Sequence, residues 1–167
     1  MPGNLTPNQM FTHDLNAVKG WPSTSAVDKS AALDDAEVSS TLFEGMVVHI
    51  DAASSKIKRG VASRAMPMFL IQNADDFDAN SDKGNISGGI VSALVAIGSY
   101  ELQTTEYSAG VYAPNVALKA DGATGKVVAT PGGQTGQDIV GICSTGVTTN
   151  AYGKSVITFW PCFLPAV

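Results

Sequence analysis

Short apolar runs separated by glycine-rich turns constrain the fold of this chain more than any other feature. From residue 42 onward, about seven such runs recur at intervals near ten residues. Turn residues end each run before a long amphipathic helix could form. The spacing therefore predicts a mainly β protein, a small antiparallel β-barrel or sandwich.

The clearest single signal is a hairpin, in which Asp121–Gly125 forms the turn between two short apolar runs. Residues 90–97 are ambiguous, because their β-branched side chains favour a strand and their alanines allow a helical turn. No internal repeat is strong enough to predict a duplicated fold. Seven strands are expected, at 42–51, 65–72, 100–107, 116–120, 126–130, 139–143 and 155–160, and the ambiguous run 90–97 would add an eighth. The polar connections are 52–60, 73–89, 131–138 and 145–154.

The first forty residues differ from the rest, so we divide the chain into an extended N-terminal arm, 1–40, and a β-rich body, 41–167. The arm holds three prolines, many small polar residues and one possible short helix at Ser30–Val38. Its apolar residues are too sparse for a core but are spaced as anchors. The arm is either a disordered tail or a segment that orders on a partner. The proposed anchors are Phe11, Leu15, Val18 and Trp21.

The C-terminal segment is apolar and aromatic where chain ends are usually polar. Its side chains should be buried, either in the core of the body or against another subunit. We expect four of them to matter for such contacts: Phe159, Trp160, Phe163 and Leu164.

The charge balance excludes a primary role on nucleic acid. The chain carries 10 Lys and Arg against 15 Asp and Glu, a formal net charge of −5. Duplex binding requires a basic stripe, and the one small cluster, Lys56, Lys58 and Arg59, is predicted to be a solvated turn. Charged residues make up only 15% of the chain, against about 25% on average, which suits surfaces covered by partners.

Neither a membrane segment nor a secretion signal is expected. No apolar stretch reaches about eighteen residues, and the start lacks a basic region followed by an apolar one. Synthesis in a cytoplasm is the expectation. The two cysteines, Cys143 and Cys162, lie in apolar runs and are predicted to be buried free thiols, with a disulfide as the alternative.

Three motifs partly match nucleotide-binding, calcium-binding or catalytic sites, and each of them is incomplete. Gly153-Lys154-Ser155 resembles the end of a phosphate loop, but Thr148 stands where the loop needs glycine. The Asp76–Asp82 loop lacks the glycine and glutamate of a calcium site, so at most it binds a cation weakly. His49 and Asp51 share a strand face, but Cys143, the nucleophile they would need, has apolar neighbours. We therefore expect no enzyme activity and no cofactor.

Several segments together resemble the head decoration proteins, or capsid cement proteins, of tailed bacteriophages. The opening run Phe43–Asp51 has a glycine, a hydrophobic strand and an aspartate, and a lysine- and glycine-containing turn at Lys56–Gly60 follows. The closing strand is similar as well. The later matching segments are Tyr112–Leu118, Gly125–Val128, Ile139–Cys143 and Ile157–Pro161.

The resemblance implies a non-enzymatic protein on the exterior of an icosahedral virion, made in the host cytoplasm. It implies the major capsid protein as partner, and copies of the chain itself, a homotrimer first and a dimer as the alternative. The arm would order on the shell by strand addition. Two alternatives stay open: another virion β-module in the tail, baseplate or fibre base, and a cellular ligand-binding β-barrel.

Overall fold

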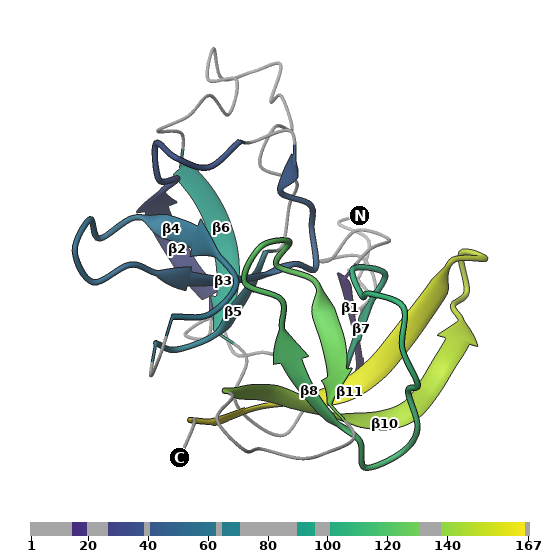
Figure 1. Ribbon diagram of the computed structural model, residues 1–167. Helices are drawn as coiled ribbons and strands as arrows, with labels where there is room; N and C mark the ends of the chain where they lie inside the picture. Colours follow the sequence, from purple (N-terminus) through teal and green to yellow (C-terminus); the bar gives the residue numbers. More distant parts are fainter. Residues whose placement is uncertain are drawn as a thin grey trace, which may run out of the picture.

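The computed structural model describes residues 15–19, 27–38, 41–62, 65–70, 90–95, 101–130 and 138–165. In these ranges the chain forms two antiparallel sheets and no α-helix, which confirms the mainly β prediction (Figure 1). Neither sheet closes on itself, so the barrel alternative is wrong.

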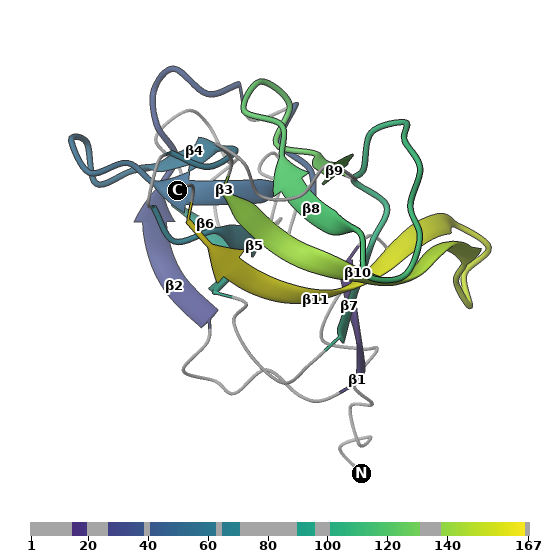
Figure 2. The same ribbon diagram turned by 60° about the horizontal axis from the view of Figure 1, so that its bottom comes forward.

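One sheet has six strands and the other has five (Figures 1 and 2). The order of the six-stranded sheet is β1 (Leu15–Lys19), β7 (Glu101–Thr104), β11 (Ser155–Leu164), β10 (Ile139–Thr149), β8 (Ala117–Ala120) and β9 (Val127–Thr130). The order of the five-stranded sheet is β2 (Val27–Ala32), β6 (Ile90–Val95), β5 (Met68–Leu70), β3 (Val47–Ile50) and β4 (Ile57–Arg59).

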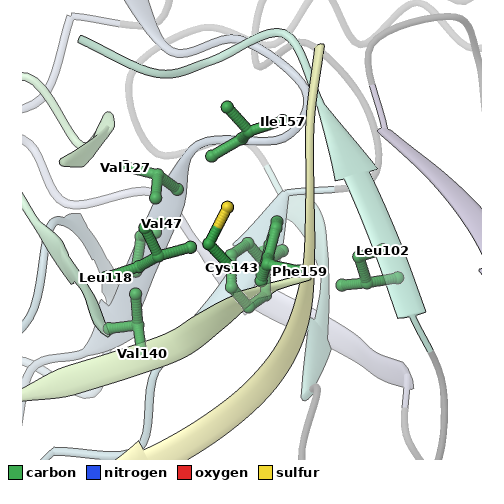
Figure 3. Close-up of a cluster of buried hydrophobic side chains, with 9 residues drawn as sticks. Val47, Leu102, Leu118, Val127, Val140, Cys143, Ile157 and Phe159 are labelled. Carbon is green, nitrogen blue, oxygen red and sulfur yellow. The ribbon is translucent and has the colours of Figure 1, made fainter. Parts of the chain in front are cut away.

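The main core joins the two sheets. Val47 and Phe69 of the five-stranded sheet are fully buried among side chains of the six-stranded sheet. The rings of Phe69 and Phe159 lie 5.4 Å apart in a tilted arrangement, within the distance range of favourable aromatic pairs. Figure 3 shows this cluster, whose other members are Leu102, Leu118, Val127, Val140, Cys143 and Ile157.

A second core lies on the opposite face of the five-stranded sheet. Successive side chains of a strand point to opposite faces, so Val47 enters the main core while Val48 enters the second one. Leu33 belongs to it and is fully buried, although the sequence assigned it to the arm. The remaining members are Leu42, Met46, Ile57, Met68 and Leu70.

The fold is built twice from one strand pattern, which the sequence reading missed. The strands β2 to β6 are ordered β2-β6-β5-β3-β4, and β7 to β11 are ordered β7-β11-β10-β8-β9 with the same antiparallel pairings. A parallel bridge precedes the hairpin in each half, Leu33 to Ile57 and Tyr107 to Val127. We call residues 27–95 the first repeat and residues 101–164 the second repeat; β1 adds an edge strand beside β7.

The hairpins of the two repeats correspond residue by residue, with numbers that differ by 70 (Asp51 and Asp121). In both, the aspartate carboxylate accepts backbone N–H groups of the turn, Ser54 in one and Ala123 and Thr124 in the other. An Asp side chain that bonds backbone two or three residues on stabilises such a turn. The hairpin predicted around Asp121–Gly125 is confirmed.

The repeats touch where two backbones approach closely. The Val47 amide donates to the Gly125 carbonyl at 2.7 Å. A Cβ built on Gly60 would lie 2.8 Å from the Gly122 Cα, and Gly60 has a φ of +72°. Glycine is therefore required at position 60, because a side chain would meet both backbone strain and the neighbouring repeat.

Four predictions about element boundaries need correction. The connection expected at 52–60 is wrong in part, because it contains the strand β4. The helix expected at Ser30–Val38 is wrong: β2 runs to Ala32, and a turn follows. The connection expected at 145–154 is mostly strand, since β10 continues to Thr149. The first body strand, expected from residue 42, begins at Val47, because Gly45 lies in the turn before it with a φ of 87°. The ambiguous run 90–97 contains the strand β6.

Candidate interaction surfaces

The outer end of the β10–β11 hairpin extends away from the other described strands (Figure 1). Ladder pairing with β8 ends at Ile142, and pairing with β7 ends at Ile157. The hairpin then continues to its turn at Asn150–Lys154, where the Asn150 side chain accepts two backbone N–H groups. Val147 and Tyr152 on this part are 48% and 44% exposed. The sequence reading missed this surface, although the β-branched run 147–149 favours a strand.

The four C-terminal candidates divide by strand alternation. Phe159 is fully buried and belongs to the main core. Its neighbour Trp160 points to the opposite face of the sheet and is 47% exposed. Phe163 is half-buried, and Leu164 is exposed near the end of β11. Of the two alternatives, core or subunit contact, Phe159 fits the first and Trp160 and Leu164 fit the second.

The four arm candidates are only partly within the described residues. Leu15 and Val18 lie in β1, where Leu15 is the cross-strand partner of Thr104 and Val18 lies at an irregularity in the pairing with β7. Phe11 and Trp21 lie outside the described residues. The structure therefore places two of the four arm positions in a sheet of the body, and their contact with a partner stays a prediction.

The basic cluster on β4 is neutralised by carboxylates. Lys58 lies 3.6 Å from Asp34 and 3.5 Å from Asp51, and Arg59 pairs with Glu37. Backbone N–H bonds, from Ala36 to Asp34 and from Ser54 to Asp51, are the largest cause that lowers the pKa of each carboxyl. The cluster is thus a set of ion pairs that fixes residues 34–37 against β4, instead of the solvated turn we expected.

The catalytic candidates have structural partners. The His49 ring is buried with Nδ1 3.0 Å from the Gly60 carbonyl oxygen, and the Asp51 carboxylate accepts from the backbone and hydroxyl of Ser54. Cys143 lies in the apolar main core. Within the described ranges, no group of three His, Cys, Asp or Glu side chains could hold a metal ion. The Asp76–Asp82 loop lies outside these ranges.

Two further sequence motifs are settled by local geometry. Gly153 lies in the β10–β11 turn with a φ of 77°, so Gly153-Lys154-Ser155 belongs to a hairpin and precedes a strand. Both cysteines are free, Cys143 buried and Cys162 half-buried. Burial raises the pKa of the Cys162 thiol, which disfavours the reactive thiolate.

Comparisons with known proteins identify no relative: no family model, no curated protein and no solved structure matches this chain. The described part contains no helix with the length and apolarity of a membrane span. The exposed residues of the β10–β11 hairpin and the residues of the arm are therefore the basis for proposing a function.

Proposed function

We propose that this protein is a structural component of a bacteriophage virion that binds the outside of the icosahedral capsid and stabilises the mature shell. Its partners would be the major capsid protein and further copies of itself. The observation that carries the proposal is the exposure of large apolar side chains along the β10–β11 hairpin, with Val147, Tyr152, Trp160 and Leu164 all between 42% and 48% exposed. Trp and Tyr are enriched among the few residues that dominate the energy of protein interfaces, so Trp160 and Tyr152 are the proposed anchors.

Charge and chemistry of the described residues support the same proposal. The basic residues of β4 are paired with carboxylates, so they offer no stripe for nucleic acid. His49, Asp51 and Cys143 have structural partners that occupy them. The sequence resemblance to decoration proteins adds the capsid as the specific partner. Many copies on one shell would multiply a modest affinity at each site.

The arm would supply a second contact with the shell. In the sequence, Phe11 precedes β1 and Trp21 follows it, and β1 itself pairs with β7 of the body. An extended segment that adds to a sheet edge gains affinity from main-chain hydrogen bonds and specificity from its side-chain pockets. Phe11 and Trp21 are the proposed anchors in those pockets.

Co-sedimentation with expanded, undecorated phage heads tests the proposal. A variant without residues 1–14 removes Phe11 but keeps β1, so it separates the role of the arm from the integrity of the sheet. We expect it to melt as the full chain does and to bind heads more weakly. Trp21→Ser should weaken binding in the same direction, with Val111→Ser, at a 75% exposed position, as the matched control. Full binding by both arm variants would contradict the arm contact.

A component of the tail, baseplate or fibre base is the second candidate, because the same exposed hairpin would serve contacts in a ring or fibre. Binding to isolated tails with no binding to heads would favour it. A cellular ligand-binding barrel receives no support, since neither sheet closes on itself.

A further inference from the structure

The strand next to the arm and the last strand of the body lie on either side of one central strand. In the six-stranded sheet β7 has β1 on one side and β11 on the other. Leu15 of β1 and Ile157 of β11 are both cross-strand partners of Thr104, and two residues further along the two strands again share a partner, Leu102. Because β1 and β11 are both antiparallel to β7, they run parallel to each other.

This arrangement decides how tension along the chain reaches the sheet. A force transmitted through the arm enters β1 at Leu15, beside Thr104. A force on the C-terminal segment enters β11 at Leu164, beyond the opposite end of β7, because β11 passes Leu102 at Phe159 and continues to Leu164. The two forces therefore pull in opposite directions along parallel strands, and they slide β1 against β7.

Sliding loads the bonds between the two strands together. The hydrogen bonds of an antiparallel pair run perpendicular to the strands, so tension parallel to the strands is shared among all of them. Tension that opens the pair from one end instead breaks the bonds one after another. The strand β1 has four register partners on β7, and under sliding the bonds along this register must yield together.

The contact between β1 and β7 is the part of this arrangement that yields first. Among the described strands β1 has only β7 as a neighbour, and its register shifts between Ala17 and Lys19. By contrast, β11 is paired on both sides, with β7 and along most of its length with β10. Phe159 of β11 and Leu102 of β7 are also fully buried in the main core. We therefore expect β1 to leave β7 before the repeats separate.

We propose that β1 is a mechanical latch, which holds the arm to the body under tension along the strands and opens under tension applied across the Leu15 end. The inference deepens the arm contact of the proposed function and rests on it for its role, since an arm and a body bound at two places on a shell would load β1. The dependence of strength on direction is a property of the free protein.

Single-molecule force spectroscopy of the full chain tests the latch in two pulling directions. Handles at residues 1 and 167 slide β1 along β7. Handles at residue 1 and at Ala151, an exposed position in the β10–β11 turn, pull from the Thr104 end, because this turn precedes β11 and Ile157 lies beside Thr104. At one loading rate, the first rupture should need a higher force in the first direction. That rupture should release only the chain up to β2, with the two repeats still folded.

Two results would overturn the latch. One is a rupture force that is equal in the two directions, or higher when the protein is pulled from Ala151. The other is unfolding of a repeat before β1 is released in the sliding direction. Both results come from the wild-type sequence around β1, so neither depends on a variant that fails to fold.

A pair of proline variants tests whether the bonds between β1 and β7 hold the latch. Register pairs of antiparallel strands alternate between hydrogen-bonded and non-hydrogen-bonded, so of Asn16 and Ala17 only one donates its N–H to β7. Proline removes the N–H, and an edge strand tolerates it where that N–H faces away from the sheet. One of Asn16→Pro and Ala17→Pro should therefore lower the rupture force in the sliding direction, and the other serves as its matched control. An unchanged force in both variants would overturn the latch.

Head binding separates this inference from the proposed function. A protein whose rupture force depends on direction as described but which never binds expanded heads supports the latch and refutes the capsid role. A protein that saturates heads but ruptures at the same force in both directions overturns the latch and leaves the capsid role standing.

Discussion

Neighbouring residues on β11 should respond very differently to truncation, and this difference tests the assignment of the two sheet faces. Phe159 is fully buried between the repeats, whereas Trp160 is 47% exposed on the outer face. Replacing each with alanine removes a large aromatic side chain from adjacent backbone positions. The pair is therefore its own matched control.

The magnitudes follow from burial. Truncation of a buried Phe to Ala lowers the free energy of unfolding by about 3–5 kcal/mol, which includes the cavity left behind. Phe159 also loses its ring contact with Phe69 at 5.4 Å. Full burial of a large apolar side chain is worth about 1.5–3 kcal/mol, so Trp160, which is buried by about half in a single chain, should contribute about 1 kcal/mol.

Urea denaturation followed by circular dichroism measures both free energies, and dilute protein keeps self-association out of the comparison. We expect Phe159→Ala to cost at least about 2 kcal/mol more than Trp160→Ala. In thermal melts, the Phe159→Ala loss corresponds to a fall in Tm of about 6–20 °C for a chain of this size. Equal losses, or a larger loss for Trp160→Ala, would refute the assignment of the two faces.

Three further perturbations test other parts of the structure. Gly141→Ala should lower the free energy of unfolding by about 1–3 kcal/mol, because its Cβ would lie 2.6 Å from the Phe159 ring; an unchanged urea midpoint would contradict the packing. Hydrogen bonds from Thr124 and Ala123 lower the pKa of Asp121 below 3.8, so this carboxylate stabilises the fold above that pH and loses its effect as pH falls through the folded pKa. Asp121→Asn keeps the turn acceptor, and its urea midpoint should fall less between neutral pH and about pH 2 than that of the wild type; equal falls would show that the carboxylate is not involved. Tyr152→Ser at the hairpin turn should change stability by no more than about 0.5 kcal/mol yet weaken head binding, and undiminished binding would remove the hairpin turn from the interface.

Local turn chemistry made some of the fold predictable. The 116–130 hairpin follows from Asp121–Gly125 between two β-rich runs, and the structure confirms it. The helix expected at Ser30–Val38 followed from local preference alone. Pairing of β2 with β6 overrides that preference, because strand propensity depends on the neighbouring strand more than on the residue itself.

The duplication escaped the sequence reading for a related reason. The two hairpin turns share an aspartate, an alanine two residues later and a lysine five residues later, which are Asp51, Ala53 and Lys56 in the first repeat. Most apolar residues at corresponding positions of the two hairpins differ. What they share is a set of backbone bonds and pairings between strands far apart in the chain. The amino-acid composition of a short segment does not predict pairings between strands that are far apart in the chain.

The candidate surfaces were predictable only in part. Strand alternation places Phe159 and Trp160 on opposite faces, but both are aromatic, so their sequence does not tell which one faces the core. The packing of the two repeats on each other determines which side chain is buried, because Phe159 of the second repeat lies against Phe69 of the first. The exposed turn of the β10–β11 hairpin could not be predicted from the sequence, because the prediction depends on β10 continuing to Thr149, beyond its pairing with β8.

Binding to the phage head tests the central claim most directly. The measurement is the number of copies that co-sediment with expanded, undecorated phage heads, as protein concentration is raised. The capsid role predicts saturation at a fixed number of copies per head, with no binding to unexpanded heads and weaker binding by the variant that lacks residues 1–14. No saturable binding to expanded heads would contradict the proposed function.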